Sequence, residues 1–184
     1  GDVDIDADGF VKALSGSYGG DITGSATFYD MVATSGNLKL DNVDATSGVA
    51  NFTANNGNIT VKGGGLDAVG DINLVSGTGN INVNKAVNGS DITLDASGGG
   101  DVIVDGLNGG TLRALTTSGE GGDINISANG DVDFINSADA DASASGNNLR
   151  GGTIVINATT GRVKTSSSTV FDTTGDSNGA NNYV

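Results

Sequence analysis

The amino-acid sequence predicts an all-β chain wound as a parallel right-handed β-helix, a β-solenoid with coils of about 20 to 22 residues. The first observation behind this prediction is a recurring five-residue motif, the Gly-Asx motif, in which a glycine and an Asp or Asn precede alternating apolar and polar residues. Gly57-Asn58-Ile59-Thr60-Val61 is one copy. Glycine followed by Asx suits a tight turn, and strict alternation over β-branched residues indicates a half-buried strand.

The second observation is the spacing of the motif, which recurs in two interleaved series with one period. Such a period, between 20 and 50 residues, is typical of solenoids. A third apolar position in each coil, as at Leu66, Val87 and Leu112, predicts three short strands per coil and a roughly triangular cross-section. One series starts at residues 36, 57, 79, 100 and 122, and the other at residues 48, 70, 90, 110, 130 and 152.

The composition fits this fold and excludes several functions. The 184 residues predict one domain, residues 1–184, with 36% hydrophobic and 4% aromatic residues. That is little for a round core, whereas each solenoid coil is a thin layer covered by its neighbours. A net charge of −14 argues against a nucleic-acid partner. The absence of cysteine excludes disulfides and Cys-ligated metals, and no apolar run is long enough to insert as a membrane helix.

Taken in order, residues 1–35 are expected to form irregular or capping coils, because large apolar side chains gather there. Residues 36–171 are expected to form the regular coils. Within each motif Ile59 and Val61 exemplify the inward positions, and Thr60 exemplifies the outward one. Asn side chains at the corners are expected to stack and bond to one another along the solenoid.

Near residues 136–151 the coils are interrupted by a low-complexity insert. Its alternating small residues, 138–145, fit either a thin strand or a protruding loop. Ile103 and Val155 are apolar at outward positions, so they predict a small patch that binds a partner or, as we expect, packs under the insert. Residues 172–184 form a polar tail, expected to fray or to cover the last coil.

Acidic residues that follow glycine are the main candidates for chemistry. They fit a column of calcium ligands, a pair of catalytic carboxylates or turn capping. We expect turn capping, because Asp bonds its own backbone in tight turns and neither calcium-binding repeat spacing nor EF-hand spacing is present. The sequence therefore predicts no metal site and no cofactor. These residues are Asp21, Asp71, Asp91, Asp101, Asp123 and Asp131.

The basic residues predict no catalytic site either. Lys39, Lys62 and Lys85 step by about 23 residues and predict one exposed column, which we interpret as a solvated ladder. Thr60 and Thr93 do not recur in every coil, as a flat ice-binding ladder would require. We therefore expect no enzyme. A polysaccharide-active β-helix enzyme and a calcium-stabilised module remain lesser alternatives.

Two segments resemble the recurring units of filamentous-haemagglutinin-like bacterial exoproteins. They are LRALTTSGEGGDINI, residues 112–126, and ADASASGNNLRGGTIVI, residues 140–156. The resemblance extends over about residues 36–171. It implies the repeat region of a large β-helical protein exported to the cell surface, often by two-partner secretion. Members of that family serve adhesion, biofilm formation and cell contact. Their secretion domain carries Asn-Pro motifs, and this chain has no proline, so only the fold and the surface location are implied.

Together these features predict a non-enzymatic, extracellular structural or adhesive segment of a bacterial surface adhesin or fibre, acting as a stiff spacer and contact surface. Its expected partners are neighbouring coils of the same or identical chains and a cell-surface glycan or protein. The alternative is a subunit of a self-assembling extracellular filament, stacked end to end.

Overall fold

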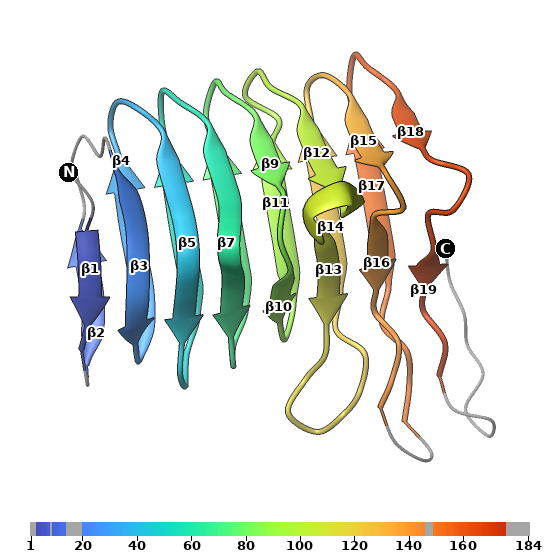
Figure 1. Ribbon diagram of the computed structural model, residues 1–184. Coiled ribbons are helices and arrows are strands. Elements are labelled where there is room, and N and C mark those ends of the chain that lie inside the picture. Colours follow the sequence, from blue (N-terminus) through green and yellow to red (C-terminus); the bar gives the residue numbers. More distant parts are fainter. Residues whose placement is uncertain (1–2, 8, 14–19, 146–148, 176–184) are drawn as a thin grey trace.

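The computed structural model describes residues 3–7, 9–13, 20–145 and 149–175. Parallel strands wind round one axis in successive coils, so that the chain forms the predicted all-β solenoid (Figure 1). Within the described residues the only helix is a three-residue 3-10 turn, η1 (Gly106–Asn108). The fold class expected from the Gly-Asx motif is confirmed.

Two sheets make the walls of the solenoid. The strands of the seven-stranded sheet, called sheet B, are β2 (Phe10–Ala13), β4 (Phe28–Ala33), β6 (Ala50–Ala54), β8 (Ile72–Ser76), β11 (Ile92–Ala96), β14 (Ile124–Ala128) and β17 (Ile154–Ala158). The twelve-stranded sheet, called sheet A, begins with β1 (Val3–Asp6), β3 (Asp21–Ala26), β5 (Leu38–Ala45) and β7 (Ile59–Ala68).

Sheet A divides into two branches after β7. One branch continues through β9 (Ile81–Val83), β12 (Val102–Asp105), β15 (Val132–Ile135) and β18 (Val163–Thr165). The other continues through β10 (Val87–Gly89), β13 (Thr111–Ala114), β16 (Asp139–Asp141) and β19 (Phe171–Asp172). The ten-residue strand β7 pairs with both β9 and β10. Its bend lies at Gly63 and Gly65, whose positive φ values of 59° and 99° suit glycine. Three strands per coil are therefore found only beyond β7.

In the described residues the strand pairs between coils are parallel, and their register shifts only within the β3–β5 and β5–β7 pairs. Ile59 pairs with Ile81, and Val61 with Val83. In Figure 1 the sheet A strands on the near side run downward and the sheet B strands behind them run upward while the chain advances from left to right. This sense of winding is right-handed, as expected.

The core is a set of stacked apolar columns. The inward positions of the motif, such as Ile59, Val61 and Ile81, are fully buried, whereas Thr60 and Asn82 between them are partly exposed. Because each coil covers the next, Ile, Val, Leu and Ala suffice to fill this narrow interior. The predicted alternation of inward and outward residues is confirmed.

The coil length changes along the chain, which corrects the expected grouping of the motifs. Corner hydrogen bonds join residues 21 or 22 apart as far as Asp101, and 30 or 31 apart beyond it. Ile124 pairs with Ile92, and Val132 pairs with Val102, so the motifs at 122 and 130 belong to the opposite series from those expected. The longer coils accommodate η1 and a loop, residues 115–121, that projects at the lower edge in Figure 1.

The low-complexity insert contributes to the core. Its residues 139–141 form β16, which pairs with β13 and β19. Ala138, Ala140 and Ala142 are fully buried, so the small alternating residues form a thin strand that faces inward. Residues 146–148 of the predicted insert lie outside the described part of the chain.

The two ends are described in part. Tyr29 and Met31 of the predicted irregular coils are buried in sheet B, and the Tyr29 hydroxyl donates a hydrogen bond to the Gly24 carbonyl at 2.9 Å. In the predicted tail, Asp172 pairs with Asp141 in sheet A, and Thr173 is buried. Residues 1–2, 8, 14–19 and 176–184 lie outside the described residues.

The predicted outer patch does not form. Ile103 lies on β12 in sheet A and Val155 lies on β17 in sheet B, so they face different sides of the solenoid. Val155 is 54% exposed and is not covered by the insert, whose strand β16 belongs to sheet A. The sequence marks both residues as outward-facing, but it does not show that one lies on sheet A and the other on sheet B.

Candidate functional site

The Asx side chains of the motif form a ladder along one corner of the solenoid. Each side-chain oxygen accepts a hydrogen bond from the backbone N–H of the equivalent residue in the next coil. The bonds run from Asn58 to Asn37 at 2.8 Å, Asn80 to Asn58 at 2.8 Å, Asp101 to Asn80 at 2.9 Å, Asp131 to Asp101 at 2.8 Å and Arg162 to Asp131 at 2.7 Å.

A second, shorter ladder follows the corner before sheet B. The backbone N–H of Asp123 donates to Asp91 at 2.7 Å, and that of Thr153 donates to Asp123 at 2.9 Å. In both ladders the bond joins neighbouring coils, whereas we expected Asp to bond its own turn and Asn to bond Asn. An isolated turn has no neighbouring coil, so only the stacked fold supplies the N–H group. The prediction that these carboxylates cap their own turns is therefore wrong for Asp91, Asp101, Asp123 and Asp131, which join neighbouring coils.

The other two glycine-associated carboxylates lie elsewhere. Asp21 forms an ion pair with Lys62, 2.6 Å from Oδ2 to Nζ, and Asp71 lies exposed at the start of β8. In the described residues no group of three or more acidic side chains is arranged to hold a metal ion. Of the six candidates, Asp101 and Asp131 are therefore neighbours on the first ladder, Asp91 and Asp123 are neighbours on the second, and Asp21 and Asp71 lie on neither.

The predicted lysine column does not form. Lys39 pairs in register with Thr60, and Lys62 pairs with Asp41. Lys85 lies in the connection between β9 and β10. A step of 23 residues exceeds the coil repeat of 21 or 22, so the three side chains drift off one line.

Lys164, Asp131 and Asp133 form an ion-pair cluster in which Lys164 and Asp131 shift each other's pKa. Lys164 contacts the Asp131 carboxylate and lies 3.4 Å from Asp133 Oδ1 on the outer face of sheet A. The hydrogen bond from Lys164, together with the Arg162 N–H, lowers the pKa of Asp131. The same contact raises the pKa of Lys164. Both side chains are partly exposed, so this cluster is a surface ion pair that links two coils.

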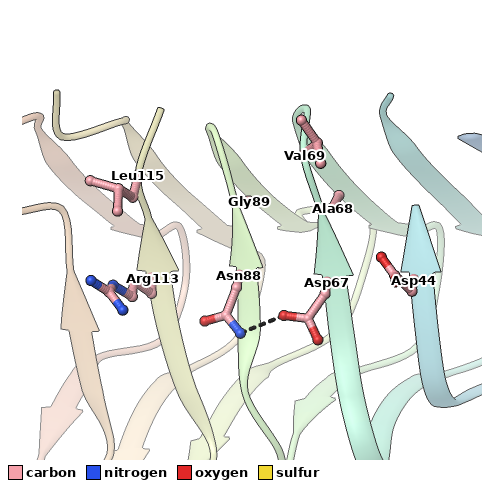
Figure 2. A pocket seen from close by; sticks show the side chains of 8 residues that line it. All are labelled: Asp44, Asp67, Ala68, Val69, Asn88, Gly89, Arg113 and Leu115. Carbon is pink, nitrogen blue, oxygen red and sulfur yellow. Dashed lines mark hydrogen bonds between the residues drawn. The ribbon is translucent and has the colours of Figure 1, made fainter. Parts of the chain in front are cut away.

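A hollow of about 410 Å³, called here the Asp67 hollow, lies on the outer face of sheet A. Four outward side chains lie in one row across it, each from a different coil: Asp44, Asp67, Asn88 and Arg113. Strand register places them side by side, Asp44 against Asp67, Asp67 against Asn88, and Asn88 against Arg113. Figure 2 shows this row running from strand to strand.

The row contains two carboxylates, then an amide, then a guanidinium. Asn88 Nδ2 donates to Asp67 Oδ1 at 2.6 Å, which orients both side chains (Figure 2). Arg113 is 55% exposed, and its Nε lies 3.8 Å from Asp141 Oδ2. Beside the polar row Figure 2 shows a second row with Leu115, Ala68 and Val69. The hollow therefore pairs an apolar strip with a polar strip across successive coils.

A second hollow of about 420 Å³ continues the first toward the N-terminal coils. It shares Asp44 and Asp67 and extends over Asp4, Ser25 and Asn42. The two hollows together, called the sheet A groove, cross the coils parallel to the solenoid axis. We did not predict this groove from the sequence. Its signal is the outward residue after each third apolar position, because Asp67, Asn88 and Arg113 directly follow Leu66, Val87 and Leu112.

Comparisons with known proteins identify no relative of this chain. No protein-family model matches the chain, and no curated protein or solved structure is significantly similar to it. Among the described residues there is also no helix of the length and apolarity needed to span a membrane.

Proposed function

We propose that the chain is a non-enzymatic β-solenoid segment of a secreted bacterial surface adhesin or fibre, in which it acts as a stiff spacer and a contact surface. The observation that carries this proposal is the continuous ladder of inter-coil bonds. From Asn37 to Arg162 every coil is tied to the next at the same corner. Such coupling between neighbouring coils suits a rod that keeps a fixed length.

The outer faces support a contact role more than a catalytic one. Catalytic groups usually show pKa values perturbed by burial or by a coupled partner inside a cleft. Asp131 and Lys164, whose contact lowers the pKa of the carboxyl and raises that of the amine, form an ion pair on the outer surface and do not line the sheet A groove. The groove itself is an open strip of hydrogen-bonding side chains, which favours holding a partner at the surface.

The proposal is tested by displaying the chain on cells that lack adhesins. Attachment to host cells or to other bacteria is measured in a flow chamber, and polysaccharides incubated with the purified chain are analysed by mass spectrometry. We expect attachment that disappears with the core variant Ile81→Asp, and intact polysaccharides. Release of oligosaccharides by the folded chain, or attachment indifferent to unfolding, would overturn the proposal.

The alternative, an end-to-end filament subunit, is favoured by the last coil that the structure describes. Val163 continues a core column whose preceding member, Val132, is fully buried, yet Val163 itself is 46% exposed. Exposed apolar strand edges are templates for another chain. A second copy stacked on this end would make a heterologous contact, which propagates as an open filament.

Electron microscopy and light scattering of the purified chain separate the two roles. The spacer proposal predicts monomers or irregular aggregates. The filament predicts regular fibres that are lost with Val163→Asp and kept with the matched variant Val155→Asp, because Val155 faces outward from sheet B. Fibres of that behaviour would replace the spacer proposal.

A further inference from the structure

We propose that the sheet A groove is a saccharide-binding site that takes a neutral glycan lying across successive coils. This inference rests on the proposed contact function and names its partner. The groove joins the Asp67 hollow to its neighbour over Asp4 and Ser25, so it offers one continuous strip and not a single closed pocket.

The first argument is the two-row layout. A sugar ring has hydroxyls at its edges and apolar C–H groups on its faces. In the Asp67 hollow, Val69 and Leu115 provide apolar surface beside the polar row, on either side of Gly89 (Figure 2). Val69 is 43% exposed, which leaves apolar surface for a ligand to cover. The hollow thus matches the amphipathic character of a saccharide better than that of a fully apolar ligand.

The second argument is hydrogen-bonding capacity. A hydroxyl donates one hydrogen bond and accepts others, so a vicinal pair is best held by a mixture of acceptors and donors. Because Asn88 Nδ2 and Asp67 Oδ1 bond each other, Asp67 Oδ2 and Asn88 Oδ1 are left as acceptors. The guanidinium of Arg113 supplies donors one strand further along. All three groups are planar and project from rigid strands.

The third argument is charge, which selects among glycans. Asp44 and Asp67 lie side by side in the groove, and Arg113 already has Asp141 at 3.8 Å. The chain carries a net charge of −14. A sulfated or sialylated glycan would therefore be repelled along most of the groove, whereas a neutral one avoids that cost.

The fourth argument is periodicity. Successive polar side chains are one strand spacing apart, about 4.8 Å, and they continue over four coils from Asp44 to Arg113. A glycan of several rings can place one ring after another along this row. Single contacts at an exposed surface are weak, on the order of millimolar, so useful attachment depends on many copies displayed together.

The test uses the whole 184-residue chain. Neutral tetrasaccharides of glucose, galactose, mannose and N-acetylglucosamine are titrated by saturation-transfer and chemical-shift NMR, with a sulfated tetrasaccharide as comparison. We expect one or more neutral probes to bind and to shift the amides of β7, β10 and β13. The sulfated probe should bind more weakly.

Two matched variants locate the site. Asn88→Ala removes a groove amide, and Asn125→Ala makes the same change on the exposed face of sheet B. Asn88→Ala should weaken binding by about three- to tenfold, the effect of one lost hydrogen bond, while Asn125→Ala should leave it unchanged. The proposal is overturned if no neutral tetrasaccharide binds, if the sulfated probe binds best, or if both variants behave alike.

The same variants separate this inference from the proposed function. If Asn88→Ala weakens tetrasaccharide binding in NMR as expected, yet cells attach in the flow chamber as strongly as before, the contact function stands and uses another surface as well. If tetrasaccharides bind and cells do not attach, the groove stands and the adhesive function fails. If neutral tetrasaccharides fail to bind while cells attach normally, the groove inference alone is refuted.

Discussion

Asn80 is the link through which the corner ladder can be tested. Its side-chain oxygen accepts from the Asp101 N–H at 2.9 Å, and its own N–H donates to Asn58 at 2.8 Å. Replacing it with alanine removes the acceptor and keeps the donor. The Asp101 N–H then lies at a partly buried corner without its bond. One interface between coils is weakened while both neighbouring interfaces keep their rungs.

The expected cost follows from the geometry. A hydrogen bond contributes about 0.5 to 1.5 kcal/mol net, and a buried N–H left without an acceptor costs about 1 to 3 kcal/mol. Asn80 is half-buried, so water can replace part of the bond, and we expect a loss of about 1 to 2 kcal/mol. Asn80→Asp keeps an acceptor oxygen and should lose less than half of that.

The assay combines urea unfolding with amide hydrogen exchange. Stability in a solenoid is close to a sum of coil and interface terms, so the lost rung should lower the unfolding midpoint or separate the transition into two. The Asp101 amide should lose protection first. Asn82→Ala is the matched control, because Asn82 lies two residues away on the outward face between Thr60 and Ile103.

Two results would refute the reasoning. If Asn80→Ala and Asn82→Ala destabilise the chain equally, the ladder contributes nothing beyond an ordinary surface amide. If the Asp101 amide keeps its protection in Asn80→Ala, its N–H depends on a different acceptor. Either outcome would also remove the main support for the stiff-spacer function.

Three further comparisons test the rest of the fold. Ile81→Asp places a charge in the fully buried core and should cost several kcal/mol, whereas Asn82→Asp should be nearly silent; equal thermal shifts would contradict the inward and outward assignment. Gly100→Ala should cost about 2 kcal/mol or more, because a Cβ would overlap a backbone carbonyl oxygen of the preceding coil. Gly99→Ala, with its nearest atom at 3.3 Å, should cost clearly less in the same melt. Lys164→Gln removes the ion pair with Asp131. That pair lowers the pKa of Asp131 and raises the pKa of Lys164. The ion pair's contribution to stability is fully present between pH 3.8 and 10.5, the ordinary pKa values of the two groups. It is lost as the pH falls through the lowered pKa of Asp131, and again as the pH rises through the raised pKa of Lys164. Stability of wild type and Lys164→Gln should therefore differ near pH 7 and converge at both extremes; a constant difference would contradict the pairing.

Much of the wall of the solenoid follows from local sequence. The alternation at Ile59, Thr60 and Val61 was enough to assign inward and outward faces, because side chains in a strand point to opposite sides with a period of two. The repeat of the motif was enough to stack Ile81 on Ile59, since the coil length is constant there. Even the thin strand β16 was among the alternatives that the alternating alanines offered.

The groove and the later coils did not follow in this way. Asp67, Asn88 and Arg113 become neighbours only when the coils are laid over one another, and their separations in sequence are not constant. The 3-10 turn at 106–108 and the loop at 115–121 lengthen the later coils, so the motif at residue 122 pairs with the other series. The spacing of a repeat along the chain does not show at which corner of the coil an inserted segment projects.

By itself, the sequence determined the class of fold, the direction in which each regular residue points and the acidic, cysteine-free surface, because these depend on local periodicity and composition. The tertiary structure alone decided which residues meet at the corners, on the outer faces and in the later, longer coils. In the folded chain the Asx side chains bond the next coil and do not cap their own turns. The three lysines lie apart, and Asp67, Asn88 and Arg113 lie in one row. The physical reason is that contacts in a solenoid run across the chain, so they depend on the length of each coil and not on the order of residues within it.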